Sequence, residues 1–288
     1  MVLSPFLSRR LPFRLARRVA TAGLSIIGTR PIITPFHDAA ALAWLYWQPS
    51  WKGQLLRRIL SDRRGPFLDV GVNFGQTLAD YLAEGLSSPY FGFEPNARCI
   101  AYVGDLVRAN SLPGIALIPC GLSAETRPIG FYFDDSDPMA ATATTRSDLR
   151  PGNRARREWM MGARLDDLAV PLGIGSVALV KIDVEGGELE ALRGMSRLLA
   201  EQRPPVMCEV LLADAKSDID AYARRVAELM DLLRALRYRV RRIVQDRAGQ
   251  WVGFEAIEAF PLARWTPENS NACDYLFEPV EAVPVAPP

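Results

Sequence analysis

One stretch of this chain, residues 179–189, constrains the fold more than any other. Its sequence is LVKIDVEGGEL. The first four residues have the apolar character of a buried strand, and the glycines lead into a helical pattern. Charged side chains are seldom placed beside a core without partners. A strand that passes directly into Lys181, Asp183 and Glu185 is therefore predicted to end at the functional edge of an open α/β sheet.

Strand-like and helical segments alternate along the chain from Pro66 onward. The predicted strands are residues 67–70, 90–93, 115–118, 177–182, 205–211, 238–244 and 273–277. The predicted helices are residues 76–86, 188–199 and 218–236, with a further helix that Asn96 caps. This alternation predicts an α/β fold, with a mostly parallel sheet covered by helices.

The composition excludes several classes of site. The net charge is +1, so no overall field favours a nucleic-acid partner. His37 is the single histidine, which excludes Ser-His-Asp and Cys-His catalysis unless this residue folds over the site. The four cysteines are scattered without a CxxC pair: Cys99, Cys120, Cys208 and Cys273. They predict neither a disulfide framework nor a zinc site, and they favour a reducing cytoplasm.

Residues 1–60 are predicted to be a basic and aromatic helical extension, ahead of a domain of residues 61–281. Arginines and apolar residues alternate over residues 9–20 in a broadly helical spacing. Two interpretations remain open: a helix packed on the domain, or a helix that contacts an acidic membrane surface or an anionic substrate. An aromatic cluster is formed by Trp44, Tyr46, Trp47 and Trp51. It predicts packing against the domain or a lid over a cleft.

The remaining end of the chain and the hydropathy add two expectations. Residues 282–288 are rich in proline and alanine, and they are predicted to be a disordered tail. No run of about 18 apolar residues is present, so we expect no membrane-spanning helix.

A second strand-to-helix junction, residues 67–75, predicts a cofactor site. Gly71 and Gly75 lie between strand and helix, where glycine permits positive φ and close approach of a ligand to the backbone. The helix N-terminus supplies free N–H groups for an anionic group. Glu94 ends the next strand, and its carboxylate is placed to accept hydrogen bonds from ribose hydroxyls. A nucleoside-bearing cofactor is therefore predicted, with residues from Cys120 to Ser123 bordering its adenine.

The spacing of this junction narrows the choice of cofactor. A dinucleotide fingerprint needs glycines where Asn73 and Gln76 stand, and no P-loop pattern is present. Asp69 followed by Gly-x-Asn-x-Gly suits a cofactor with an amine and a carboxylate, namely S-adenosylmethionine. We expect Asp69 to hold the loop or the methionine ammonium, and Thr77 and the backbone to meet the carboxylate. Alternatively, Asp69 and Asn73 only satisfy backbone groups of the turn.

Four segments, taken together, resemble one known family. They are residues 69–75 (DVGVNFG), 93–95 (FEP), 164–168 (RLDDL) and 180–188 (VKIDVEGGE). In this order they are similar to the FkbM family of S-adenosylmethionine-dependent methyltransferases, over residues 66–279. The resemblance implies the class I methyltransferase fold, a Rossmann-like seven-stranded sheet whose last strand is antiparallel. It also implies O-methylation, often of a hydroxyl on a sugar or secondary metabolite.

Methyl transfer to a hydroxyl requires alignment of the acceptor oxygen and removal of its proton. Because the predicted core has no histidine, four residues are candidates for this proton transfer: Lys181, Asp183, Glu185 and Glu209. We expect Asp183 to lie nearest the methyl group and the acceptor. Glu185 is then the base or an acceptor-binding partner, and Lys181 pairs with these acids. Glu188, at the helix start, is expected to be structural.

Two further points stay open from the sequence. We assign no metal ligand, but a divalent-metal site of Asp183, Glu185 and Glu209 is an alternative. Acceptor specificity is expected from residues 1–60 and from a long loop at residues 134–157, which follows an added hairpin strand at 129–133. The sequence thus predicts a cytoplasmic O-methyltransferase of a small molecule or glycan. N-methylation and a non-catalytic cofactor-binding scaffold are the alternatives.

Overall fold

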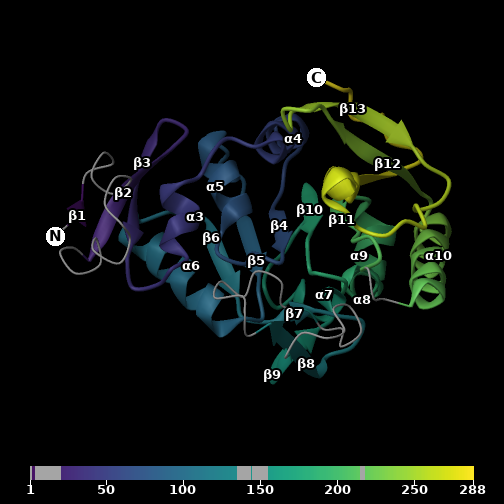
Figure 1. Cartoon of the computed structure of the whole chain (residues 1–288), viewed down its shortest axis with the longest axis horizontal. Coiled ribbons are helices and arrows are strands. Elements are labelled where there is room, and N and C mark those ends of the chain that lie inside the picture. The colour runs from purple at the N-terminus through teal and green to yellow at the C-terminus, as the bar shows by residue number, and fades with distance from the viewer. Residues whose placement is uncertain (1, 4–20, 135–143, 145–154, 215–217) are drawn as a thin grey trace.

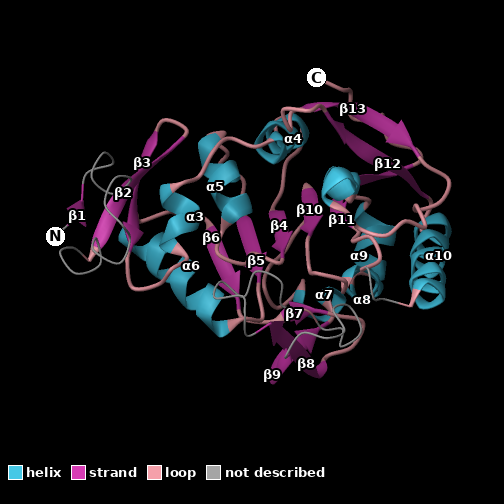
Figure 2. Cartoon of the chain, viewed as in Figure 1, coloured by secondary structure: helices cyan, strands magenta, loops and turns pink. Residues whose placement is uncertain are grey.

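The computed structural model of this chain describes residues 2–3, 21–134, 144, 155–214 and 218–288. Strands and helices alternate through its centre, and helices lie on both faces of one large sheet (Figures 1 and 2). The predicted α/β class is therefore confirmed.

Eight strands form the central sheet, in the order β13-β12-β14-β11-β10-β4-β5-β6. In chain order they are β4 (Phe67–Val70), β5 (Tyr90–Phe93), β6 (Ile115–Ile118), β10 (Leu179–Ile182), β11 (Val206–Glu209), β12 (Tyr238–Gln245), β13 (Trp251–Ala256) and β14 (Asp274–Pro279). The strands from β6 to β11 are parallel, and the last strand, β14, is antiparallel to both β11 and β12, as predicted.

The number of strands differs from the predicted seven because β13 extends the sheet by an antiparallel hairpin with β12. The segment is half exposed and contains Gly253, so it lacks the apolar run that marks the inner strands. Its first residue, Trp251, is buried against the core and anchors this edge.

The helices divide into two groups that cover opposite faces of the sheet. They are α3 (Ala41–Leu45), α4 (Trp51–Leu60), α5 (Gln76–Ala83), α6 (Ala97–Ala109), α7 (Leu165–Leu168), α8 (Glu188–Gly194), α9 (Ser196–Gln202), α10 (Ile219–Ala235) and the 3-10 helix η1 (Pro267–Ala272). Phe67 and Leu179 join the hydrophobic cluster of α3–α6, whereas their neighbours Leu68 and Val180 join that of α7–α10. This alternation follows from the two-residue period of a strand.

One predicted helix is two in the structure. The segment predicted as residues 188–199 forms α8 and α9, separated at Met195. Gly194 ends α8 against the backbone of Ser123, where an added Cβ would lie 2.0 Å from the carbonyl oxygen. The close approach of these two segments fixes the break, and a periodicity argument does not detect it.

The N-terminal segment contains strands as well as helices. β1 (Val2–Leu3), β2 (Ala22–Ile27) and β3 (Arg30–Pro35) form a separate sheet, at the far left of Figure 1. The all-helical prediction for this extension is therefore wrong for β2 and β3, whose pairing is reinforced by a buried hydrogen bond between the Ser25 and Thr34 hydroxyls. The helix predicted from residues 9–20 lies outside the described residues.

The domain boundary after residue 60 stays a prediction. Trp44 and Leu56 precede this boundary, yet they lie in one hydrophobic cluster with Phe67. The aromatic residue Trp44 is only 1% exposed, so of the two interpretations of its cluster, packing describes it.

A third sheet lies below the central sheet in Figure 1, in the order β7-β9-β8. Its strands are β7 (Gly121–Leu122), β8 (Arg127–Asp134) and β9 (Ala155–Ala163). The predicted hairpin strand at 129–133 lies within β8. The loop predicted to run to Arg157 is wrong at its end, because β9 begins at Ala155 and pairs with β8. Apart from Thr144, the middle of that segment lies outside the described residues.

The C-terminal tail contacts the sheet by hydrogen bonds, although residues 282–288 were expected to be disordered. The Val285 N–H donates to Glu278 Oε1 at 2.7 Å, and Arg241 Nη2 donates to the Val285 carbonyl at 3.0 Å. Within the parts of the chain that are described, no helix has the length and apolar character to cross a bilayer.

Candidate active site

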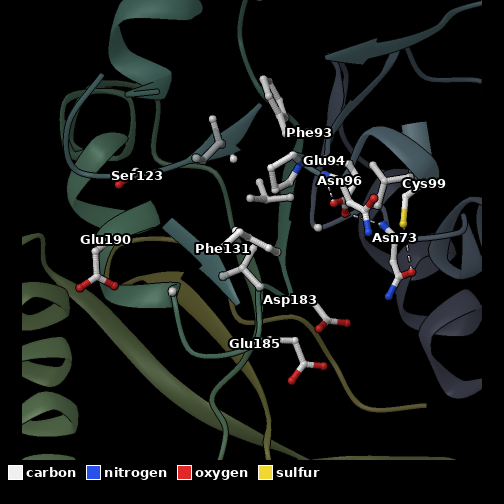
Figure 3. Close-up of a pocket in the computed structure, with 18 of the residues that line it drawn as sticks. Asn73, Phe93, Glu94, Asn96, Cys99, Ser123, Phe131, Asp183, Glu185 and Glu190 are labelled. Carbon is white, nitrogen blue, oxygen red and sulfur yellow. Dashed lines mark hydrogen bonds between the residues drawn. The ribbon is translucent and has the colours of Figure 1, made fainter. Parts of the chain in front are cut away.

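A cavity of about 590 Å³ lies at the carboxyl ends of the parallel strands. Its wall combines the loops after β4 and β10, the ends of β5 and β11, and the β8–β9 hairpin (Figure 3). This volume is within the usual range of small-molecule sites. The predicted site residues on the wall are Gly71, Asn73, Thr77, Glu94, Ser123, Lys181, Asp183, Glu185 and Glu209. Three others, Asp69, Gly75 and Cys120, do not line the cavity.

Gly71 lets the two strand-to-helix loops touch. Its φ is +88°, and an added Cβ would lie 1.8 Å from the carbonyl oxygen of Asp183. Its N–H donates to the Phe93 carbonyl at 2.9 Å, which ties the same loop to β5. Gly71 is thus required by the packing of three strand ends, in addition to any approach of a ligand.

Gly75 has a packing role instead of the predicted contact with a cofactor. An added Cβ would lie 2.8 Å from the Trp44 ring, and the Trp44 indole donates to the Phe74 carbonyl at 2.8 Å. Gly75 is also the N-cap of α5, where no side chain caps the helix and the first turn contains no acid. The backbone N–H groups at this helix start, beside Gln76 and Thr77 on the cavity wall, are therefore suited to an anionic group.

Glu94 closes the loop after β4. One carboxylate oxygen accepts from the Asn73 N–H and the other from the Asn96 N–H, both at 2.8 Å (dashed lines in Figure 3). Burial raises the pKa of Glu94 to about 7, against the lowering effect of these two bonds. Each carboxylate oxygen has a second lone pair, so the group retains capacity for hydroxyls within the cavity.

Asp69 lies beneath the cavity and not on its wall. Its side chain is fully buried, with Lys181 Nζ 3.1 Å from Oδ1 and the Tyr90 hydroxyl donating to Oδ2. Lys181 also donates to the Gly71 carbonyl at 3.0 Å. Burial raises the pKa of Asp69 even though Lys181 and Tyr90 oppose it. Of the two roles expected for Asp69, this geometry allows the support of the loop, and it leaves no path to a methionine ammonium.

Asp183 lies on the wall at the end of β10, with a quarter of its side chain exposed. Its Oδ2 is 3.5 Å from Lys181 Nζ and 3.6 Å from Lys52 Nζ. Burial opposes ionisation, but these two ammonium groups hold the pKa of Asp183 well below its usual range. Asp183 is therefore an anion at neutral pH.

Glu209 reaches the same place from β11 and shares a hydrogen bond with Asp183. Burial and the charge of Asp183 raise the pKa of Glu209. The two carboxyl groups are therefore coupled, and their shared hydrogen bond favours the ionised form of Asp183 and the protonated form of Glu209. Asp274, paired with Glu209 in register on β14, adds a third, half-buried acid whose pKa is raised by loss of solvent.

The loop after Asp183 carries one glutamate into the cavity and buries another. Glu185 has a φ of +52°, its side chain lines the cavity, and its carbonyl accepts from the Thr144 hydroxyl at 2.6 Å. Figure 3 shows Asp183 and Glu185 projecting from this junction. Glu188 is 4% exposed and accepts from the Gly186 N–H at 2.7 Å, and burial raises its pKa to about 7. Glu188 thus closes its own loop, in accord with the expected structural role.

The metal alternative finds no cluster to support it among the residues that the structure describes. Asp183, Glu185 and Glu209 all line the cavity, but no group of three acids, cysteines or histidines there is arranged to hold an ion. The Asp183 carboxylate is instead ion-paired with the ammonium groups of Lys52 and Lys181.

Sequence reasoning missed several residues of the wall. Lys52 comes from α4, inside the segment treated as an extension, and nothing in its neighbourhood marks it as functional. The β8–β9 hairpin contributes Phe131, Arg157 and Trp159, none of which was predicted to line the site. Arg157 and Trp159 belong to β9, which was not recognised as a strand. The segment ARREWMMGA has a charged block followed by an apolar block and lacks the alternation of a half-buried strand, so its strand conformation follows from its pairing with β8.

One protein family matches more than half of this sequence. A family profile described as the methyltransferase FkbM domain matches residues 69–240. The matched region contains both strand-to-helix junctions and excludes α4. A comparison with curated proteins finds no match.

This chain is similar to several solved structures, each at low sequence identity. Methyltransferase FkbM from Methylobacillus flagellatus KT is 16% identical, with a TM-score of 0.48, and the match covers 83% of this chain and 52% of that protein. This chain thus spans about half the length of that structure. An rRNA methylase from Streptococcus thermophilus is 13% identical, covering 80% and 94% of the two chains at a TM-score of 0.38. M. jannaschii TYW2, solved in complex with AdoMet, is 13% identical, covering 91% and 88% at a TM-score of 0.35.

Proposed function

The chain belongs to the FkbM methyltransferase domain family, and from this premise we propose that it methylates a hydroxyl of a small molecule or glycan, with S-adenosylmethionine as methyl donor. One observation carries the proposal. A single cavity contains the loop after β4 with Glu94 and, at the end of the neighbouring strand β10, the ionised Asp183. A nucleoside-binding edge and a proton-accepting edge therefore open into the same space.

The residues of the first junction suit S-adenosylmethionine. Glu94 offers carboxylate lone pairs to ribose hydroxyls, and the uncapped start of α5 at Gln76 and Thr77 offers N–H groups to a carboxylate. Ser123, on the wall beyond the third strand, supports the expected adenine side. Cys120 does not line the cavity, so we omit it from this assignment. When bound, S-adenosylmethionine supplies a methyl group on a positively charged sulfur.

The second junction supports removal of the acceptor proton. The anionic Asp183 is placed to accept a hydrogen bond from an acceptor hydroxyl, because Lys52 and Lys181 keep it ionised. The hydroxyl proton passes to Asp183 as the oxygen becomes methylated, and the low pKa of Asp183 favours its release to solvent. Glu209 stabilises the anion as a hydrogen-bond donor before the transfer. Glu185 is the second candidate for binding the acceptor.

The partner and compartment expectations stay part of this proposal. A net charge of +1 supports a small acceptor instead of a nucleic acid. The four cysteines are free and buried, which supports a reducing compartment such as the cytoplasm. Membrane contact through the basic N-terminus concerns residues that lie outside the described ones.

Cofactor binding is tested by calorimetric titration with S-adenosylmethionine. Glu94→Gln keeps the size of the side chain but loses the charged acceptor, so we expect a loss of about 10- to 100-fold in affinity. Glu188→Gln is the matched control, because Glu188 is also a buried glutamate that accepts from a loop N–H but does not line the cavity. Equal affinity in the Glu94→Gln variant and the parent would refute the ribose assignment.

Methyl transfer is tested with labelled S-adenosylmethionine and a metabolite extract. Transfer to an oxygen supports the proposal, whereas transfer to a nitrogen identifies an N-methyltransferase. Cofactor binding without transfer to any extract favours the scaffold alternative. Asp183→Asn should lower the transfer rate by about 10²- to 10⁴-fold. Transfer that survives exhaustive chelation removes the metal-assisted alternative.

A further inference from the structure

The start of α4 is fixed to α5 by partly buried hydrogen bonds. Ser50 is the N-cap of α4, and its hydroxyl donates to Asp80 Oδ2 at 2.6 Å. The Trp47 indole donates to Asp80 Oδ1 at 3.0 Å, and Asp80 is only 5% exposed. Farther along, Leu56 and Ile59 of α4 are buried in the hydrophobic cluster. The first turn of α4 therefore has a defined position beside the cavity.

Lys52 extends from this fixed turn to the carboxylate at the cavity wall. Its ammonium is 3.6 Å from Asp183 Oδ2, and Lys181 Nζ is 3.5 Å from the same oxygen. Less than a third of the Lys52 side chain is exposed, so solvent screens this contact less than it screens an ion pair on the surface. Among the described residues, Lys52 and Lys181 are the two cations ion-paired with Asp183.

We propose that Lys52 is a positioning residue of the methyl-transfer site: with Lys181 it fixes the Asp183 carboxylate at the cavity wall, so a helix that precedes the family-matching region completes the site. This inference rests on the proposed function for its chemical meaning. Its physical content, however, is the coupling between one lysine and one carboxylate, which can be measured without cofactor or acceptor.

The charges around Asp183 explain why a second cation is needed. Five groups interact with Asp183: Lys52 on α4, Asp69 on β4, Lys181 on β10, Glu209 on β11 and Asp274 on β14. A sixth group, Asp80 on α5, interacts with Lys52. Lys181 is shared, because Asp69 is its nearer partner at 3.1 Å. Without Lys52, the acids at the strand ends would depend on one shared ammonium group. The pKa of Asp183 would then rise, and Lys181 alone would hold its carboxylate at the cavity wall.

The experiment measures the titration of the Asp183–Glu209 pair in the full-length chain. Carboxyl ¹³C shifts of labelled aspartate and glutamate are followed against pH by NMR, and Asp183→Asn and Glu209→Gln assign the signals. Lys52→Gln removes the charge, and Lys52→Arg keeps it. Lys52→Met retains the aliphatic stem and repeats the test if Lys52→Gln unfolds. Arg57→Gln is the matched control, because Arg57 is also on α4 but pairs with Glu84 at the end of α5, away from the cavity.

We expect Lys52→Gln and Lys52→Met to move the lower midpoint of the pair upward by about 1 unit or more. Lys52→Arg should restore most of the parent value, and Arg57→Gln should leave it unchanged. A midpoint within about 0.3 unit of the parent in a folded Lys52→Gln variant, or an equal shift in Arg57→Gln, overturns the proposal. Failure of the proposed function is distinguished by another measurement, because it appears as absent cofactor binding or absent methyl transfer in the parent chain.

Discussion

The two strand-to-helix junctions share one lysine and use it in opposite ways. Lys181 Nζ is 3.1 Å from Asp69 at the first junction and 3.5 Å from Asp183 at the second. The pKa of Asp69 is nevertheless raised by burial, while the pKa of Asp183 is held low by Lys181 and Lys52 in spite of burial. The same type of residue, at the ends of adjacent parallel strands, thus has two different electrostatic states.

This difference teaches that solvent access and a second cation decide the role of a strand-end acid. Asp69 is sealed below the loop, and its contacts hold the backbone of Gly71 through Lys181. Asp183 opens to the cavity and faces Lys52 as well. The first junction is therefore a support for a binding loop, and the second presents an anion to a ligand.

The largest expected effect removes the shared lysine. Lys181→Met leaves Asp69 buried without a cation, so we expect the free energy of unfolding to fall by about 3–5 kcal/mol in chemical denaturation. Adding Asp69→Leu should recover part of this loss. Arg57→Met is the control, since it breaks an exposed ion pair with Glu84 and should cost no more than about 1 kcal/mol. A loss below 1 kcal/mol in Lys181→Met would contradict the support role.

A second prediction concerns pH and applies to both junctions equally. The pKa values of Glu94 and Glu188 are raised from 4.5 to about 7 in the folded chain. The folded state therefore binds more protons between these values, so their contribution to stability is complete below pH 4.5 and is lost as the pH rises through 7. The loss is about 3 kcal/mol for each group.

Unfolding curves of the parent, Glu94→Gln and Glu188→Gln across this pH range measure the effect. Each variant should lose less stability on going from acid to neutral pH than the parent does. Val170→Ala, an exposed and uncharged substitution, should reproduce the parent slope. Parallel curves for the parent and both variants would show that the two glutamates titrate normally.

The third prediction separates contact between the junctions from backbone strain alone. Gly71→Ala introduces a Cβ 1.8 Å from the Asp183 carbonyl, whereas Gly173 has a similar positive φ and nothing within 4 Å of its added Cβ. Both variants pay for positive φ, but only Gly71→Ala separates the two loops. We expect it to cost about 2 kcal/mol more than Gly173→Ala in thermal or chemical unfolding. Equal costs would mean that the loops yield without consequence.

The smallest expected change in stability belongs to Asp183→Asn. Lys181 keeps Asp69 as a partner, and the partly exposed Lys52 keeps Asp274 and Asp80 as acidic neighbours, so no buried cation is left without an acid. The amide oxygen of asparagine also retains an acceptor for the Glu209 hydrogen bond. We expect a change within about 1 kcal/mol at neutral pH, measured by denaturation alongside Lys181→Met. A loss near 3 kcal/mol would assign Asp183 the same support role as Asp69.

Several elements follow from local patterns alone. The bounds of β4, β5 and β6 match the predicted strands, because each is a short apolar run bounded by turn residues. The predicted cap of α6 is also confirmed, because the Asn96 side chain accepts a hydrogen bond from the Arg98 N–H at 3.0 Å. The strands β9 and β13 were missed because each is mixed in polarity and stabilised by its partner strand. The strand β2 is largely apolar, and it was missed because its segment was assigned to the helical extension.

The sequence by itself determined the α/β alternation, the two charged junctions and the chemical groups available there, because strand and helix periodicity and residue type are local properties. Only the tertiary structure decided that Asp69 is sealed, that Asp183 opens to the cavity and that Lys52 reaches it from α4. Burial and charge neighbours depend on contacts between segments far apart in the chain. The ionisation of a carboxylate follows from those contacts, and so the division of roles between the two aspartates follows from the fold.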